Sequence, residues 1–186
     1  MHIHGAVYGG KMEYWDVYDK NRKPKGFRIM RGGDRRLGKD EYHLTCHVCV
    51  FSSDGRMLIQ KRADFKGLWS GLWDVSAGGS VLAGESTREG ASRELLEEVG
   101  IAVDFYSVTP VMTFYHYDCI SDYFFAVKDV DPETLEIQST EVSAVKYATR
   151  EEILAMRQEG EFIPYKESFI NLIFDMNEST SKNLFN

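Results

Sequence analysis

The sequence predicts an α/β fold in which a mixed β-sheet is layered with helices, and three observations carry this prediction. Apolar and aromatic runs with strand-like alternation recur along most of the chain. One amphipathic helix pattern interrupts them at residues 87–99, and further helical patterns follow after residue 150. With 186 residues, of which 43% are hydrophobic, the chain suits one domain with a real hydrophobic core.

The N-terminal half is expected to hold the first strands. Residues 1–11 contain two consecutive glycines and no clear period, so we expect an N-terminal extension before a domain that spans residues 12–176. Strands are expected at 12–19, within 27–40, at 42–51, at 56–62 and at 72–78, with turns at 21–26 and 52–55 and a loop at 63–71. The turn at 52–55 contains Asp-Gly, which favours a hairpin.

The C-terminal half is expected to combine aromatic strands with helices. Strands are expected at 103–119, 120–130 and 143–149, an acidic loop at 131–142, and helices at 150–160 and in the second part of 161–177. Residues 177–186 are expected to form a polar, frayed C-terminal tail.

Charge and composition restrict the class of partner. The net charge of −7 and the pI of about 5.3 argue against a general nucleic-acid binder or membrane-surface binder. A phosphorylated small-molecule substrate stays compatible, because bound Mg²⁺ and local Lys or Arg side chains offset the charge. No apolar run approaches the length of a membrane span, and residues 1–11 lack the apolar segment of a signal peptide. We therefore expect a cytoplasmic protein.

The cysteine pattern agrees with a reducing compartment. The three cysteines, Cys46, Cys49 and Cys119, are an odd and low number, which favours free thiols. Cys46 and Cys49 form a C-x-x-C, but this spacing places them on opposite faces of a strand. Without a second pair a zinc site is disfavoured, and we expect both side chains in the core.

The helix at 87–99 has clear start and stop signals. Ser86 or Thr87 can cap its N-terminus, and Gly100 is a natural stop. Three small or aliphatic residues share one face and can pack on a core: Ala91, Leu95 and Val99. The sequence therefore predicts a helix with one buried face and another face that is free for polar side chains.

The polar face carries Glu94, Glu97 and Glu98, which stand at i, i+3 and i+4. Three crowded carboxylates repel one another, and a divalent cation removes that penalty. Hard oxygen ligands with no His or Cys nearby in sequence suit Mg²⁺ or Mn²⁺. Arg93 can reach Glu97 and hold it in place. A solvated helix face is the alternative interpretation of such a charge run, and the longer pattern around the helix makes it the weaker one.

That longer pattern begins before the helix. Gly79 is followed at fixed spacings by Glu85, Arg93 and the glutamates, which gives G-x5-E-x7-R-E-U-x-E-E-x-G-U with U a bulky aliphatic residue. All nine specified positions match, and the pattern resembles the Nudix box. The resemblance extends over roughly residues 12–176. It implies an α/β/α sandwich with a mixed β-sheet, and Mg²⁺-dependent hydrolysis of a diphosphate linked to another moiety, commonly in a nucleoside diphosphate derivative.

The resemblance also implies roles for residues of the box. The metal ligands would be Glu94, Glu97, Glu98 and the backbone carbonyl of Gly78. Glu94 would in addition act as the base or orient the attacking water, and Arg93 would position a carboxylate. Glu85 would hold the loop–helix–loop together or bind a second metal indirectly. The chemistry would be in-line attack of an activated water on phosphorus.

Two expectations concern residues beside the helix. Gly78 and Gly79 are expected to let the chain turn tightly and to bring a backbone carbonyl near the cation. A further acidic residue often comes from outside the box in this family, and Glu141 is the candidate. An ordinary exposed loop glutamate is an equally good interpretation of Glu141.

Flanking segments such as EYWDVYDKNRKPKG and GLWDVSAGG resemble the isopentenyl-diphosphate-isomerase-like branch of the superfamily. Arg62 and Lys66 match basic residues that hold the diphosphate there, with a surface position beside the hairpin as the alternative. His43 matches a metal-binding histidine. The isomerase also needs a cysteine and a histidine before its helix, where this chain has Ala77 and Ser80. The resemblance therefore supports diphosphate binding and argues against isomerisation.

An isomerase and a non-catalytic binding module are the competing functions. The isomerase uses a glutamate in a later strand, for which Asp118 and Asp122 are the nearest substitutes here. Nucleotide-binding modules without turnover usually lack part of the box, and this chain lacks none. By analogy with relatives, the aromatic strand at 12–19 could serve a homodimer.

Aromatic and histidine side chains have two interpretations. Trp69, Trp73 and Tyr115 could stack on a base or line an apolar substrate site, although the core is the better interpretation of Trp73. His43 and His47 are better interpreted as strand residues with hydrogen-bond partners than as ligands.

Overall fold

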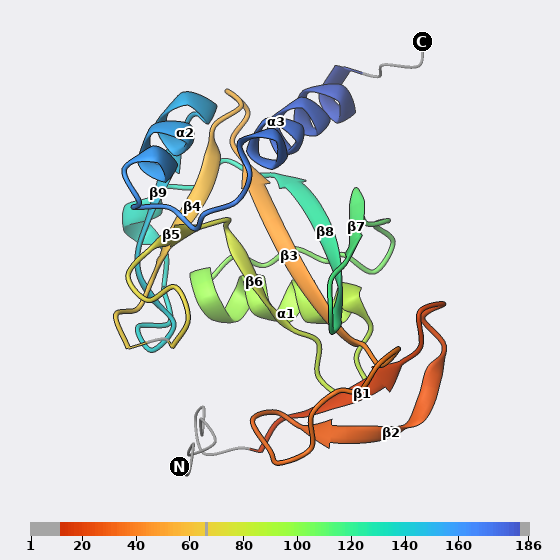
Figure 1. The fold of residues 1–186 in the computed structure, drawn as a ribbon. Coiled ribbons are helices and arrows are strands. Elements are labelled where there is room, and N and C mark those ends of the chain that lie inside the picture. The colour runs from red at the N-terminus through yellow and green to blue at the C-terminus, as the bar shows by residue number, and fades with distance from the viewer. Residues whose placement is uncertain (1–11, 66, 183–186) are drawn as a thin grey trace.

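The computed structural model describes residues 12–65 and 67–182, and a mixed β-sheet lies at its centre (Figure 1). The strands are β1 (Tyr14–Tyr18), β2 (Pro24–Met30), β3 (His43–Phe51), β4 (Met57–Arg62), β5 (Trp73–Asp74), β6 (Ala77–Ser80), β7 (Met112–Tyr115), β8 (Cys119–Val127) and β9 (Val142–Ala148). The helices are α1 (Thr87–Val99), α2 (Arg150–Gln158) and α3 (Glu167–Lys182), with a 3₁₀ turn at Pro132–Thr134. Within the described ranges, every helix is too short or too polar to cross a membrane.

The expected α/β sandwich is confirmed by the order of the strands and the two cores. The main sheet runs β5-β4-β3-β8-β7, with β6 paired to β3 and β9 paired to β4. β3 and β8 are parallel, whereas the other pairs are antiparallel. Ala91, Leu95 and Val99 of α1 pack on one face of the sheet, and α2 and α3 pack on the other (Figure 1). As expected, Cys46 and Cys49 belong to the two different cores.

The sheet splits where the chain passes from β5 to β6. β3 pairs with β4 only at Val50 and Phe51, and its earlier half pairs with β6 instead. Ser76 spans the split, because its hydroxyl accepts from the Val50 amide at 2.7 Å and donates to the Leu58 carbonyl at 2.5 Å. The single strand expected at 72–78 is therefore two short strands on different partners. At the split, Glu98 of α1 accepts hydrogen bonds from Gln60 of β4 and from Gly78 of β6.

The hairpin of β1 and β2 forms its own two-stranded sheet beside the start of β3 (Figure 1). Its turn residue Arg22 has a φ of 60° and donates two hydrogen bonds to Asp122, at 2.8 and 2.6 Å. Asp122 is fully buried and also accepts from the hydroxyls of Thr87 and Thr113, each at 2.7 Å. One carboxylate thus joins the hairpin, the sheet and the first turn of α1.

Three expected boundaries were wrong. β2 already starts at Pro24 inside the expected turn, since proline is tolerated at the first residue of an edge strand. Of the segment 103–119, only Met112–Tyr115 forms a separate strand, after Pro110, which has no amide hydrogen for a ladder, while Cys119 already begins β8. α3 continues to Lys182, past the expected end of the final helix at residue 177, because no Pro or Gly interrupts it. The expected extension at 1–11 lies outside the described residues.

Candidate functional site

Both ends of α1 are capped as the sequence predicts. Ser86, not Thr87, is the N-cap, and it forms a reciprocal capping box with Glu89. Gly100 ends the helix with a φ of 70°, a left-handed conformation that glycine adopts without strain. These caps and the buried apolar face fix the rotation of the helix, and that rotation presents the glutamates to the split in the sheet.

Arg93 is the centre of an ion-pair network on α1. It donates to both carboxylate oxygens of Glu85, at 2.8 and 3.0 Å, and to the Ser80 carbonyl at 3.2 Å. Its third nitrogen lies 3.0 Å from Glu94 and 3.1 Å from Glu97. The expected reach from Arg93 to Glu97 is confirmed. Glu85, eight residues before Arg93, pairs with the same guanidinium. The Arg93 side chain therefore connects the loop before α1 to two carboxylates of the helix, those of Glu94 and Glu97.

Glu98 is the most deeply buried of the three glutamates, with 2% of its surface exposed. One of its oxygens, Oε2, accepts from the side-chain amide of Gln60 at 2.9 Å and from the backbone amide of Gly78 at 3.0 Å. Gln60 comes from β4 and Gly78 from β6, so the carboxylate lies where the sheet splits. Two donors stabilise its ionised form and fix its orientation.

Glu94 packs directly against the backbone of β6. A Cβ atom added to Gly79 would lie 2.5 Å from the Glu94 Cδ carbon, which is closer than atoms can approach. Burial, and next the charge of Glu98, raise the pKa of Glu94 from 4.5 to about 7, against the opposing effect of Arg93.

The raised pKa of Glu94 predicts a stability effect that depends on pH. The folded protein holds a proton that the unfolded chain loses above pH 4.5, so stability falls between about pH 4.5 and 7 as pH rises. Glu94→Gln removes this penalty. We expect the metal-free variant to exceed the wild type by roughly 2–3 kcal/mol in unfolding free energy at pH 8, and to equal it at pH 4. Urea unfolding in EDTA at the two pH values measures this, and equal stabilities at pH 8 would contradict it.

The expected tight turn at Gly78 and Gly79 was wrong. Both glycines lie in β6, where they pair with His47 and Cys46 of β3. Glycine is required at both positions for a different reason. A side chain at either position would enter space that other groups fill. At Gly78 that group is the His47 ring, 2.7 Å from an added Cβ, and at Gly79 it is the carboxylate of Glu94.

The donor set fits a hard divalent cation. It consists of carboxylate oxygens and nearby backbone carbonyls, which Mg²⁺ and Mn²⁺ prefer. The glycine backbone at β6 cradles Glu94, and the pKa of Glu94 is raised first by its burial and next by the charge of Glu98. Glu97 is half exposed, with 49% of its side chain accessible, and so faces solvent at the edge of the set.

Arg62 and Lys66 are the basic residues that the sequence places beside the site, and the structure describes only Arg62. Arg62 is largely buried, lies 3.6 Å from Asp74 and donates to the Leu68 carbonyl at 3.3 Å. Its Nε atom is buried without a partner among the described residues. Lys66 lies outside the described residues. Glu141 lies next to the residue that follows β4, because its backbone carbonyl accepts a hydrogen bond from the Ala63 amide at 2.9 Å.

The aspartates considered as isomerase substitutes have different positions. Asp122 is fully engaged by Arg22 and two threonines on the α1 side of the sheet, as described above. Asp118 is exposed, and one of its ligand atoms lies within 4.8 Å of ligand atoms of His43 and Cys119. That set combines imidazole, thiol and carboxylate groups, which suits softer metals than Mg²⁺. We therefore favour the glutamate face as the site of a hard cation.

The histidines and aromatic residues divide between core and surface. His43 stacks on Trp15 at 4.0 Å between ring centroids, and His47 stacks on Tyr123 at 4.6 Å. Burial lowers the pKa of both histidines, that of His43 to about 4, so both are neutral at pH 7. Three aromatic residues considered for substrate stacking are at least partly accessible: Trp69, Trp73 and Tyr115. Trp73 carries Lys146 on its ring face, 4.7 Å from the centroid.

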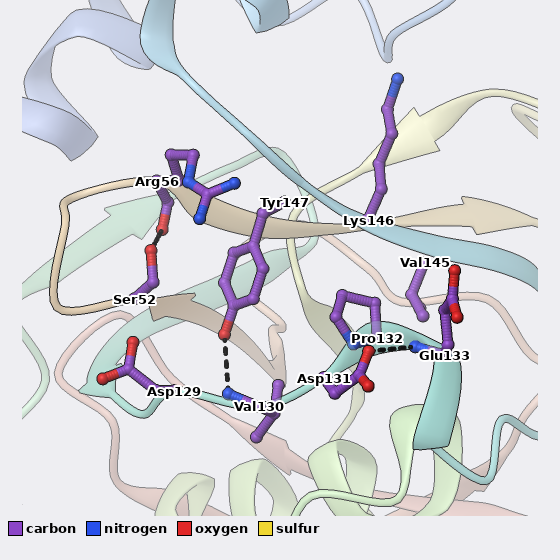
Figure 2. A pocket seen from close by; sticks show the side chains of 10 residues that line it. All are labelled: Ser52, Arg56, Asp129, Val130, Asp131, Pro132, Glu133, Val145, Lys146 and Tyr147. Carbon is purple, nitrogen blue, oxygen red and sulfur yellow. Dashed lines mark hydrogen bonds between the residues drawn. The ribbon is translucent and has the colours of Figure 1, made fainter.

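A cavity of about 520 Å³ lies away from the three glutamates of α1 (Figure 2). Figure 2 shows it between β9, the 3₁₀ turn and the turn before β4, with the Tyr147 hydroxyl accepting from the Val130 amide at 3.3 Å. It is lined by Ser52, Arg56, Asp129, Val130, Asp131, Pro132, Glu133, Val145, Lys146 and Tyr147. None of these residues belongs to the site expected from the sequence, so this hollow and the candidate chemistry are in different places.

Gln60 is the residue that sequence reasoning missed. The available signal was a polar side chain directly after the apolar run MLI in a strand. Its partner Glu98 is 38 positions later, so spacing along the chain could not connect them.

Comparisons with known proteins identify a family and a fold that the chain resembles. Residues 41–169 match the NUDIX domain family. The chain is 39% identical over 170 residues to an uncharacterised Nudix hydrolase of Listeria monocytogenes, covering 91% of this chain and 98% of the relative. It is 31% identical over 146 residues to an isopentenyl-diphosphate Delta-isomerase of Pectobacterium atrosepticum, covering 74% and 76%. The crystal structure of DR0079 from Deinococcus radiodurans is similar in fold, with a TM-score of 0.68 and 24% identity over 87% of this chain and 97% of that one.

Proposed function

The chain belongs to the NUDIX domain family, whose hydrolases act on pyrophosphate bonds. From this family membership and the geometry of the site, we propose a specific reaction. It is a Mg²⁺-dependent hydrolase that cleaves the diphosphate linkage of a nucleoside diphosphate derivative or a related small-molecule diphosphate. The observation that carries this proposal is the carboxylate pair Glu94 and Glu98. Glu98 is buried and held by two donors, and Glu94 has a pKa raised to about 7 beside it.

The different environments of the three glutamates support a different role for each of them. Glu98 is the fixed anchor for the cation, and Glu97 is a solvent-facing ligand. Glu94 is placed beside Glu98 on the same face of α1 and would accept a proton from the attacking water or orient it. A bound divalent cation supplies charge neutralisation at the phosphate oxygens and lowers the pKa of bound water.

Surrounding residues complete the proposed site. Arg93 keeps two carboxylates in position through its network, and Glu85 fixes the guanidinium on the opposite side. The N–H of Arg62 Nε has no hydrogen-bond partner among the described residues and would donate to a phosphate oxygen, and Lys66, four positions later in the sequence, is a further candidate. Gly78 and Glu141 stay candidates for an additional oxygen ligand, and Gly79 for the cradle of Glu94.

Isomerisation of isopentenyl diphosphate is the second candidate, and the similarity to the Pectobacterium isomerase is what favours it. Ala77 and Ser80 disfavour it, because they occupy the positions matched to the catalytic cysteine and the metal-binding histidine. Ala77 is moreover completely buried in the core beneath α1. A cysteine at that position would face the core and not a substrate.

Product analysis by ³¹P NMR separates these reactions. The purified chain is incubated with Mg²⁺ and, in separate samples, ADP-ribose, a dinucleoside polyphosphate, a nucleoside triphosphate and isopentenyl diphosphate. We expect hydrolysis of one P–O–P linkage in at least one compound. The products would be two phosphate monoesters from ADP-ribose, two nucleotides from a dinucleoside polyphosphate, a monophosphate and pyrophosphate from a nucleoside triphosphate, or a monoester and free phosphate from isopentenyl diphosphate. Allylic diphosphate without any release of phosphate would overturn the hydrolase proposal in favour of the isomerase. Tight nucleotide binding without turnover would overturn it in favour of a binding module.

A further inference from the structure

Gln60 connects β4 to the acidic face of α1. Its side chain is buried, with 2% of the residue exposed, and lies at the split in the sheet. Its Nε2 donates to Oε2 of Glu98 at 2.9 Å, and the Gly78 amide donates to the same oxygen at 3.0 Å. Because both donors take one oxygen, the plane of the Glu98 carboxylate is determined by the sheet and not only by the helix.

The other end of the Gln60 amide is unusual. Its Oε1 is buried and has no hydrogen-bond partner among the described residues. A buried acceptor without a donor is destabilising, and native proteins keep few of them. An acceptor of this kind, next to a carboxylate that binds a cation, points to a donor that arrives with the ligand. The waters of a hydrated divalent cation are strong donors of this type.

We propose that Gln60 is a positioning residue that acts through Glu98. Its Nε2 fixes the orientation of the Glu98 carboxylate, and its Oε1 accepts a hydrogen bond from the hydration shell of the bound cation. This inference rests on the proposed function, because it takes Glu98 as a metal ligand. It adds a residue outside the sequence pattern and assigns the split in the sheet a role in metal affinity.

The chemistry of the side chain is specific at this position. Glutamate would place a second negative charge 2.9 Å from Oε2 of Glu98, and asparagine is one methylene shorter than the gap requires. Methionine has a similar length and shape without the amide, so Gln60→Met removes both hydrogen-bonding ends with little change in packing. Gln60→Asn is a second variant that keeps the amide and loses the reach.

Mn²⁺ titration followed by electron paramagnetic resonance tests the inference without a substrate. We expect Gln60→Met and Gln60→Asn each to raise the Kd for Mn²⁺ about 10-fold, as is usual when a partner of a metal ligand is removed. Thr113→Val is the matched control, because it removes one hydrogen bond to the buried carboxylate of Asp122, which lies outside the acidic face. It should lower the unfolding midpoint and leave the Kd unchanged. Circular dichroism confirms that each variant is folded.

The double variant Gln60→Met with Glu98→Gln distinguishes positioning from a general structural effect. If Gln60 acts through Glu98, Gln60→Met should add clearly less than its own roughly 10-fold loss when Glu98→Gln is already present, because only the contact of Oε1 with the hydration shell is then left to lose. Independent, multiplying losses would overturn the positioning role. A Kd for Gln60→Met that matches the wild type, with a clear loss for Glu98→Gln, would refute this inference and leave the proposed function intact. An unchanged Kd for Glu98→Gln would refute the proposed metal site itself.

Discussion

Glu98→Gln should lower the rate of diphosphate hydrolysis by roughly 1,000-fold, which corresponds to about 4 kcal/mol of transition-state stabilisation. The reason is the environment of the carboxylate. Gln60 and Gly78 both present donors to Oε2, so the new amide must turn its oxygen toward them. Its NH₂ group then occupies the position of the other carboxylate oxygen, and a donor replaces a metal ligand.

The effect should be specific to the acidic face of α1. Glu151 is an exposed carboxylate in the first turn of α2, so Glu151→Gln removes the same charge far from the proposed cation. We expect its kcat and KM to match those of the wild type. Initial rates over a range of Mg²⁺ concentrations compare the three proteins. A Glu98→Gln enzyme that keeps more than about a tenth of the wild-type rate at saturating Mg²⁺ would show that Glu98 is not an essential ligand.

Arg22→Met should destabilise the protein by about 3 kcal/mol, the amount typical of removing one partner of a buried ion pair. Asp122 is completely buried, and Arg22 supplies two of the hydrogen bonds that it accepts, beside one each from Thr87 and Thr113. Methionine keeps most of the side-chain length, so the loss isolates the guanidinium. Urea unfolding at pH 7 measures the difference. An Arg22→Met variant within about 0.5 kcal/mol of the wild type, the usual range of a surface substitution, would contradict this account.

The pH dependence gives this prediction a second measurement. Burial would raise the pKa of Asp122, but hydrogen bonds from Arg22, Thr113 and Thr87 outweigh it and hold the pKa below 3.8. A lowered folded-state pKa contributes stability above pH 3.8 that is lost as pH falls through the folded value. The gap between wild type and Arg22→Met should therefore narrow in acid. Arg28→Met, which breaks an exposed pair with Asp16 in the same hairpin, should change stability by less than about 1 kcal/mol.

Local signals in the sequence predicted the helix and its acidic face well. Caps, apolar spacing and the glutamate positions all act within one or two turns, so α1 could be predicted almost to the residue. The partners of that face come from elsewhere in the chain. Gln60 lies 38 positions before Glu98, and Arg22 lies 100 positions before Asp122. Only the order of the strands brings them together, and spacing in the sequence does not contain that order.

The split in the sheet explains two of the differences from the sequence-based expectations. A continuous strand at 72–78 is the simplest interpretation of an apolar run, yet β5 and β6 pair with different neighbours around Ser76. The same pairing places Gly78 and Gly79 in a strand, where contact with other side chains and not turn geometry requires glycine. Tertiary contacts therefore decided these positions against their local propensity.

The most direct test of the central claim is Mg²⁺-dependent release of phosphate or nucleotide from a panel of diphosphates, with the wild type run beside Glu97→Gln and Glu98→Gln. Our account predicts release from at least one compound by the wild type, no release in EDTA, and a large loss in both variants. The loss should be greater for the buried Glu98 than for the half-exposed Glu97. Full activity of both variants on a compound that the wild type hydrolyses would contradict the claim that the acidic face of α1 is the active site.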